Sequence, residues 1–440
     1  MTVTDAAPAR ADADPTEELR DWLADTWDPD LTVTAWWQLL GLAGWSNPLL
    51  PVGCYGRGIS RGDSIRVSRT IAEHGALGPP AGLGLMLAAP TIATHGTTEQ
   101  VESYVRDIVT GQRAWCQLFS EPGAGSDLAG LSTRAMRDGD LWVINGQKVW
   151  TSGGHIGDMG MLLARTDASV PKHQGITWFA FDMHQPGAEV RPLKEMTGHT
   201  MFSEVFFSDA TVEDAARIGG TNDGWAVAQT TLLWERSGMG AGGGGAALGA
   251  RPGTIAGDLD KRAGDFVRAP STTKRGDTDR RPASPAAAQI ALARSVGKDA
   301  DPVVRQALAK AHILGELSRM NTERHKAVRA GGGDIPGIAN FSKLLMADIV
   351  RHNRDLGMQL LGARGMLHAY TDAQRETLAT APGGNAAAAV TAQALSAQAL
   401  PIYGGTDQIQ RNIIGERALG LPKEPGDLSR LPFNELPKNA

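Results

Sequence analysis

The spacing of apolar and polar positions changes character twice along the chain. Up to about residue 114 the pattern is mainly helical, with predicted helices over 16–27 and 99–109 and a candidate N-cap at Thr97 or Thr98. The next hundred residues carry short apolar runs between turn residues, which predict strands at 141–144, 147–150, 159–164, 176–183 and 204–207. From residue 222 onward helical spacing returns, over 225–239, 301–329, 341–361 and 406–418.

This order of elements predicts an α+β protein with three domains. We expect an N-terminal helical domain over residues 1–114, a central β-barrel domain over 115–217, and a C-terminal helical domain, a four-helix bundle, over 218–440. The dipeptide Asn145-Gly146 lies between two apolar runs and predicts a hairpin with a type I′ turn, because both residues accept positive φ angles. The segments 240–284 and 381–394 fit no pattern, and the sequence assigns them no role.

Charge and composition narrow the possible partners. The formal net charge is −5 over 440 residues, which gives no broad attraction to nucleic acid or to an anionic membrane. The basic residues between 274 and 281 are interrupted by acidic residues and prolines, so a solvated loop is expected there. Two cysteines, Cys54 and Cys116, supply neither a disulfide framework nor a zinc cluster, and no metal site is expected.

No targeting or membrane segment is expected either. The apolar run 81–93 is too short to span a bilayer and contains Pro90, while the acidic residues up to Asp30 lack a signal-peptide core. We therefore expect a cytoplasmic protein.

A turn-rich stretch at residues 116–130 carries the strongest chemical signal. It reads Cys-Gln-Leu-Phe-Ser-Glu-Pro-Gly-Ala-Gly-Ser-Asp-Leu-Ala-Gly, and its proline and glycines force the backbone to turn between Ser120 and Ser126. Such a turn can aim several N–H groups and hydroxyls at one small ligand. Trp150 follows the predicted hairpin and offers a flat apolar face. Together these features predict a cradle for a large, flat, anionic cofactor.

Two motifs in this order resemble those of the acyl-CoA dehydrogenase family. Residues 116–131 are similar to the family's first signature, and 403–411, Tyr-Gly-Gly-Thr-Asp-Gln-Ile-Gln-Arg, to its second. The similarity extends over about residues 51–425. The Leu-Gly-Leu-Pro at 419–422 resembles in particular the actinobacterial fatty-acid and sterol-side-chain dehydrogenases.

The resemblance implies FAD, bound non-covalently between the subunits of a tetramer. The positions that match the family's cofactor contacts are Gln117, Phe119, Ser120, Ser126, Trp150, Ser152, Gln359, Thr406 and Gln408. Taken singly, several of these residues have simpler explanations. Trp150 alone would more often be a core aromatic, Thr406 an N-cap, and Gln359 a solvated residue on a bundle helix. The segment 293–298 lacks the phenylalanine that the family commonly places there, which weakens the expected contact between subunits.

The catalytic base is displaced from the second signature. Many family members carry a glutamate where this chain has Gly404, which has no side chain. The family's isovaleryl and long-chain branches take the glutamate from an earlier helix, and Glu235 matches that position. Glu235 lies three residues after Leu232 and seven after Ala228, on an apolar helix face where desolvation raises the pKa of a carboxyl. The alternative is a buried structural glutamate.

The resemblance assigns further roles and leaves alternatives open. It implies that the Gly404 N–H helps to polarise the thioester carbonyl, and that Ser126 and Arg236 contact the acyl-CoA substrate. The expected activity is oxidation of an acyl-CoA to the trans-2-enoyl-CoA, with electron-transfer flavoprotein as electron acceptor. A flavin oxidase on the same scaffold, or a non-catalytic FAD-supporting subunit of a hetero-oligomer, stays possible. The acyl group and the choice between homotetramer and heterotetramer are not determined by the sequence.

Overall fold

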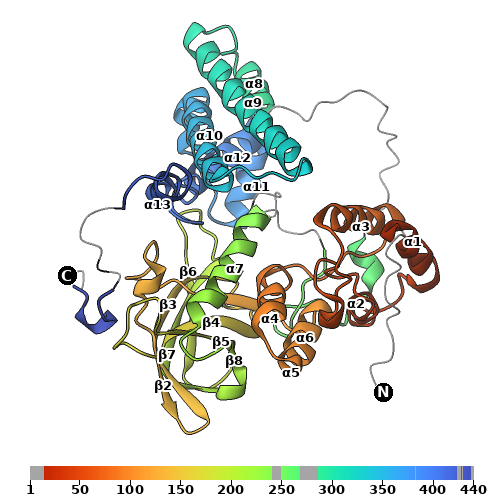
Figure 1. Cartoon of the computed structure of the whole chain (residues 1–440). Coiled ribbons are helices and arrows are strands. Elements are labelled where there is room, and N and C mark those ends of the chain that lie inside the picture. Colours follow the sequence, from red (N-terminus) through yellow and green to blue (C-terminus); the bar gives the residue numbers. More distant parts are fainter. Residues whose placement is uncertain are drawn as a thin grey trace. The chain divides into compact units, whose positions relative to one another are not determined.

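The computed structural model describes residues 14–239, 249–267, 286–381, 383–423, 428 and 430–437. Contacts divide the chain into two compact units (Figure 1). The first unit comprises Met1–Leu193, Met201–Lys274 and Leu428–Ala440, and the second, helical unit comprises Lys194–Thr200 and Arg275–Asp427. The predicted basic loop at 274–281 and most of the segment 240–284 lie outside the described residues.

Seven helices of the first unit are described: α1 (Pro15–Thr26), α2 (Val33–Leu42), α3 (Arg61–His74), α4 (Ala89–His95), α5 (Thr98–Gln100), α6 (Arg106–Val109) and α7 (Gly224–Met239). Polar N-caps start α1, α2 and α3 at Asp14, Thr32 and Ser60. Thr97 caps α5 with a reciprocal bond from Gln100, which confirms the candidate cap. A π-helical turn, Val101–Val105, joins α5 to α6, so the predicted helix over 99–109 is present with one widened turn.

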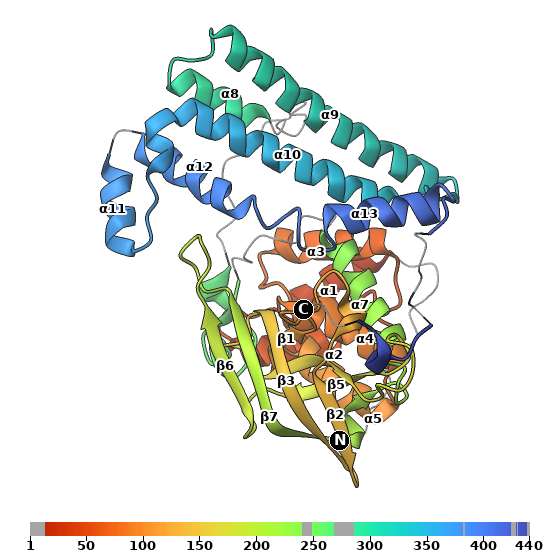
Figure 2. The ribbon, with the colours of Figure 1, turned by 90° about the vertical axis from the view of Figure 1, so that its left-hand side faces the viewer.

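The β-strands of the first unit form one mixed sheet. They are β1 (Trp115–Leu118), β2 (Arg134–Asp138), β3 (Leu141–Ser152), β4 (Met159–Arg165), β5 (Ile176–Asp182), β6 (Ala188–Leu193), β7 (Phe202–Glu213) and β8 (Arg217–Ile218). Their order is β6-β7-β3-β2-β4-β5-β8, with β1 pairing in parallel with β4. Figure 2 shows β6, β7 and β3 side by side. Within the described residues, β6 and β8 do not pair with each other, so the sheet is open and the predicted closed barrel is corrected.

The predicted turn at Asn145-Gly146 is wrong. The chain turns instead at residues 139–140, and β3 runs straight through Asn145 and Gly146 with a shift of register against β7. A Cβ on Gly146 would lie 2.5 Å from Thr133 Oγ1 and 2.7 Å from Thr133 Cα. The glycine therefore serves the close approach of a neighbouring segment, while the Asn145 side chain donates to Asp209 across the irregularity at 2.9 Å.

The helical unit contains α8 (Ala286–Ser295), α9 (Pro302–Ala330), α10 (Ile338–Leu361), α11 (Asp372–Thr380), α12 (Gly384–Ser396) and α13 (Asp407–Ile413). Residues of α8, α9, α10 and α12 share one apolar core, as a helical bundle requires. The ambiguous segment 381–394 is mostly α12. The Asp301 side chain accepts from Val303 and Val304 N–H groups and caps α9, with Pro302 at its first position.

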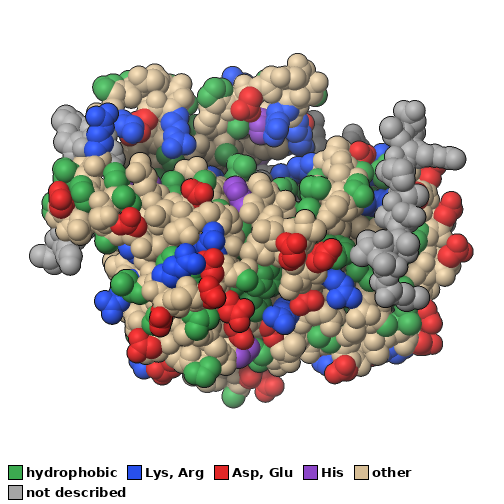
Figure 3. All heavy atoms as spheres, turned by 60° about the horizontal axis from the view of Figure 1, so that its bottom comes forward, with side chains coloured by type: hydrophobic (Ala, Val, Ile, Leu, Met, Phe, Trp, Pro, Cys, Tyr) green, Lys and Arg blue, Asp and Glu red, His purple; other side chains and the backbone are tan. Residues whose placement is uncertain are grey.

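The surface carries both signs of charge. Acidic and basic side chains are interspersed over the face drawn in Figure 3. Among the helices that the structure describes, none is long and apolar enough to cross a membrane.

Candidate active site

Glu235 lies on α7, a helix packed against α4 and β5 of the first unit. One turn before it, Thr231 is fully buried and its hydroxyl lies 3.0 Å from the Thr91 hydroxyl of α4. Ala228, on the same face, is also fully buried. This packing places Glu235 on the apolar face of α7, as its spacing predicted, with its own side chain partly buried.

The Glu235 carboxylate contacts the predicted cofactor cradle. Gln117 Nε2, on β1, donates to Glu235 Oε2 at 3.3 Å. Burial raises the pKa of the Glu235 carboxyl above its ordinary value of 4.5, and the Gln117 bond and the charge of Arg236 only partly oppose that rise. A predicted cofactor residue and the predicted base, 118 positions apart, thus meet at one place.

The loop after β1 is folded back into a tight turn. Glu121 and Ala124 exchange two backbone hydrogen bonds of 3.0 Å, with Pro122 and Gly123 at the tip. The Val149 N–H donates to the Ser120 carbonyl at 2.9 Å, which fixes the loop beside β3. This arrangement brings the chain around Ser120 next to the part of β3 that carries Trp150 and Ser152.

A buried ion pair beneath this loop was not predicted from the sequence. Lys148 Nζ lies 2.8 Å from Glu121 Oε1 and donates to the Phe119 carbonyl at 3.0 Å, and the lysine side chain has 0% exposure. The Glu121 carboxylate also accepts from Ser132 N–H and hydroxyl and from Thr133 N–H, at 2.7–2.9 Å. The pair ties the loop, β3 and the approach to β2 together at one carboxylate.

The charges of this pair are strongly coupled. Although burial alone would raise it, the pKa of Glu121 falls to about 2 because Lys148 and the hydrogen bonds stabilise the carboxylate. No helical or strand periodicity in the sequence relates Glu121 to Lys148. The only sequence signal is a lysine within a predicted strand, next to Val149.

Trp150 is a surface residue held in an uncommon backbone conformation. Its φ is +60°, and 56% of the residue is exposed. An edge-on contact with Phe202, at 5.8 Å between ring centroids, fixes one side of the indole. The reading as a core aromatic is therefore excluded. A bulky residue at positive φ is strained, and such positions concentrate at ligand sites.

Ser126 and Ser152 lie on different elements of the first unit. Ser126 is exposed, and the next residue, Asp127, forms an ion pair with Lys172 Nζ at 2.7 Å. Ser152 is partly buried at the end of β3. Cβ atoms added to Gly123 and Gly125 would meet no atom within 4 Å, so the loop presents open backbone. A flat ring beside Trp150 and phosphates along this open loop fit these residues.

The remaining predicted residues belong to the helical unit. Gln359 and Gln408 are exposed. The backbone carbonyl of Gln359 accepts a hydrogen bond from Lys298 Nζ at 3.0 Å. The Thr406 hydroxyl accepts from Ile409 N–H at 3.2 Å, so Thr406 is the N-cap of α13. Gly404 has a φ of +64°. Arg236, in contrast, is an exposed residue of α7 in the first unit.

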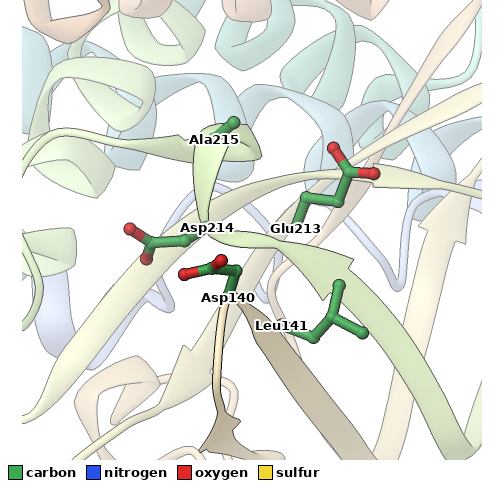
Figure 4. Close-up of a pocket in the computed structure, with 5 residues that line it drawn as sticks. All are labelled: Asp140, Leu141, Glu213, Asp214 and Ala215. Atoms are coloured by element: carbon green, nitrogen blue, oxygen red, sulfur yellow. The ribbon is translucent and has the colours of Figure 1, made fainter.

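A hollow of about 350 Å³ lies at the end of β7, lined by Asp140, Leu141, Glu213, Asp214 and Ala215 (Figure 4). None of the predicted site residues lines it. Hydrogen bonds from Arg217 and Trp142 hold the pKa of Asp214 at about 2. Asp214 therefore forms a structural ion pair with Arg217 at the end of the sheet.

Comparison with known proteins identifies the family. The family model for the acyl-CoA dehydrogenase middle domain matches residues 116–210, and that for the acyl-CoA dehydrogenase C-terminal domain matches residues 284–419. The chain belongs to the acyl-CoA dehydrogenase family. The resemblance and the enzyme class predicted from the sequence are confirmed. Acyl-CoA dehydrogenases are FAD flavoproteins that use acyl-CoA substrates and form oligomers.

Individual relatives agree with this assignment. The chain is 34% identical to the acyl-CoA dehydrogenase IpdE1 of Mycobacterium tuberculosis, over 89% of this chain and 88% of that protein. It is 35% identical to the acyl-CoA dehydrogenase FadE34 of the same organism over 84% of this chain, but spans only 44% of FadE34. The ChsE4–ChsE5 complex from M. tuberculosis has a TM-score of 0.61 at 25% identity, covering 96% of this chain and 100% of that chain.

Proposed function

We propose that this acyl-CoA dehydrogenase oxidises an acyl-CoA thioester to the trans-2-enoyl-CoA, with Glu235 as the base that removes the α proton. The observation that carries the proposal is the Glu235 carboxylate itself. It is partly buried, its pKa is raised, and it accepts a 3.3 Å hydrogen bond from Gln117 on β1, the strand that leads into the predicted cofactor loop. A carboxylate with a raised pKa is a stronger base than an ordinary carboxylate and is better suited to accept a proton from a weak carbon acid.

The residues around Glu235 have separable tasks. Gln117 donates to one carboxylate oxygen and so orients the carboxyl group. Phe119, Ser120, Trp150 and Ser152 would line the flavin ring, while Ser126 and the open loop before it would hold the anionic part of FAD. When bound, FAD supplies the acceptor for the hydride that leaves the β carbon. In the helical unit, Gln359, Thr406 and Gln408 would contact FAD, and the Gly404 N–H would polarise the thioester carbonyl, with Arg236 on the CoA portion.

The proposal is tested by anaerobic bleaching of the bound flavin. Glu235→Gln should bind FAD as the wild type does but lose bleaching by an acyl-CoA panel by at least about 100-fold, because general-base catalysis is removed. Glu73→Gln, an exposed glutamate of α3, is the matched control and should bleach normally. Near-normal bleaching of Glu235→Gln would refute the assignment of the base.

The electron acceptor and the assembly belong to the same proposal. We infer electron-transfer flavoprotein as acceptor. Hydrogen peroxide formed on aerobic turnover would indicate an oxidase instead.

We also infer a tetramer, of this chain alone or with a paralogous chain. Copurification of a second chain, together with no turnover by the isolated protein, would indicate a supporting subunit.

A further inference from the structure

Residues 431–436, here called the C-terminal clasp, belong to the first unit and pack against the loop that follows β4. The Phe433 N–H donates to the Val170 carbonyl at 2.9 Å, and the Asn434 N–H donates to the Ala168 carbonyl at 3.0 Å. Pro432 lies opposite Pro171 in an isolated bridge. The clasp lies beyond residue 419, where the second family match ends. The two backbone hydrogen bonds attach the clasp to residues 168–170 of the loop that follows β4.

The Phe433 ring covers a nearly buried cation. The Arg165 Cζ atom lies 3.8 Å from the centroid of the ring, a cation–π geometry. Arg165 is only 4% exposed. A guanidinium in this position gains from an aromatic face because little water remains to solvate it.

Arg165 in turn holds the far end of the predicted cofactor loop. One terminal nitrogen donates to the Ala129 carbonyl at 2.6 Å and to the Leu131 carbonyl at 3.1 Å. The other donates to the Lys172 carbonyl at 2.6 Å. The same guanidinium therefore fixes both the loop that ends at residue 131 and the loop that the clasp joins.

The second loop reaches the predicted phosphate-binding region. Lys172 Nζ donates to both oxygens of Asp127, at 2.8 and 2.7 Å. Asp127 directly follows Ser126. His173 packs edge-on against Trp225 in the first turn of α7, at 4.9 Å between rings. The clasp, Arg165 and Lys172 thus form a continuous set of contacts that ends beside Ser126.

We propose that the C-terminal clasp is a positioning element for the cofactor loop, acting through Arg165 and Lys172. The inference rests on the proposed function, because it takes residues 120–131 as the FAD-binding loop. Beyond the turn that the Glu121–Ala124 bonds close, Gly125 adds no stiffness of its own, so the order of residues 125–131 depends on contacts with other segments. Phe433 keeps Arg165 desolvated and in place, and Arg165 holds the carbonyls of Ala129 and Leu131.

The experiment compares FAD affinity with amide hydrogen exchange in the full-length, flavin-free protein. Phe433→Ala should weaken FAD binding by about fivefold, because only part of a cation–π contact of Arg165 is transmitted to the cofactor loop, and should speed exchange over residues 127–133 and 168–175. Phe433→Tyr keeps the aromatic face and should restore both properties. Glu435→Ala, an exposed residue of the clasp, is the matched control and should leave both unchanged.

Phe433→Leu separates positioning from simple packing. It keeps an apolar side chain but removes the ring, so FAD affinity should fall while the melting temperature stays near that of the wild type. FAD affinity within twofold of wild type in Phe433→Ala would overturn the inference and leave the proposed function intact. A wild-type protein that binds no FAD would overturn the proposed function, and the inference with it.

Discussion

Two glutamates of the first unit show how surroundings set the chemistry of one side chain. Glu121 faces the buried Lys148 ammonium and several N–H donors, which hold its pKa at about 2. Glu235 is partly buried and accepts a hydrogen bond from the neutral Gln117 amide, and burial raises its pKa. The first carboxylate stays ionised and structural, whereas the second binds a proton more readily than an ordinary glutamate. Their separation in pKa distinguishes a structural carboxylate from a candidate base.

The raised pKa of Glu235 predicts a pH-dependent effect on stability. Because the folded protein holds this proton more tightly than the unfolded chain, stability is lost as the pH rises from 4.5 through the folded pKa. Glu235→Gln cannot ionise, so its advantage in melting temperature over the wild type should grow over that range. An advantage of Glu235→Gln that did not change with pH would contradict the raised pKa.

The Lys148–Glu121 pair predicts a large and asymmetric effect of substitution. Lys148→Met leaves the Glu121 carboxylate buried without its cation and should lower the free energy of unfolding by about 3–5 kcal/mol in urea denaturation. Adding Glu121→Gln removes the uncompensated charge and should recover part of this loss. A double variant no more stable than Lys148→Met would contradict this account.

The same pair predicts acid sensitivity. Although burial opposes it, Lys148 lowers the pKa of Glu121 from 4.5 to about 2, so the pair's contribution is complete above pH 4.5 and is lost as the pH falls towards 2. Acid titrations of melting temperature should therefore show a smaller loss in the double variant Glu121→Gln/Lys148→Met than in the wild type. An equal loss in both proteins would assign the acid sensitivity to other groups.

At the scale of single elements, local patterns located several helices well and one turn badly. The helix predicted over 301–329 matches α9 to within a residue, and the structure shows Asp301 as its cap with Pro302 at its first position. Asn145-Gly146 carried an equally local signal, but β3 continues because β7 pairs with it on both sides of the irregularity. Long-range strand pairing outweighed the turn preference of the dipeptide. The Lys148–Glu121 contact escaped prediction for the same reason, since 27 positions separate its partners.

The glycine in this irregularity gives a prediction for β3. Gly146→Ala should destabilise the protein by about 1–3 kcal/mol, because the new methyl group would overlap Thr133 backbone and side-chain atoms. Gly123→Ala is the matched control, since its Cβ meets nothing within 4 Å and should change the melting temperature little. Equal melting temperatures for the two variants would show that β3 and Thr133 can separate without cost.

At the scale of the whole molecule, the order of helical and strand regions could be predicted from the sequence, but the partners of each helix could not. Helical spacing fixed which face of α7 is apolar, and hence the setting of Glu235. It could not indicate that this face meets Thr91 of α4 and Gln117 of β1, because periodicity carries no information about the neighbour. Trp150 was found by motif, yet its exposure and positive φ depend on the irregular path of β3.

The apolar face of α9 gives the prediction that concerns assembly. Ile313, Leu317 and Met320 are 50–55% exposed and follow one another at helical spacing, so they form a stripe on one face. Exposed apolar stripes of this kind mark subunit interfaces, and members of this family form oligomers. Leu317→Lys should reduce the mass measured by light scattering after gel filtration, because a buried ammonium opposes association. Gln306→Lys introduces the same charge at an exposed polar position of α9 and should leave the mass unchanged. An unaltered mass for Leu317→Lys would place the subunit interface elsewhere on the chain.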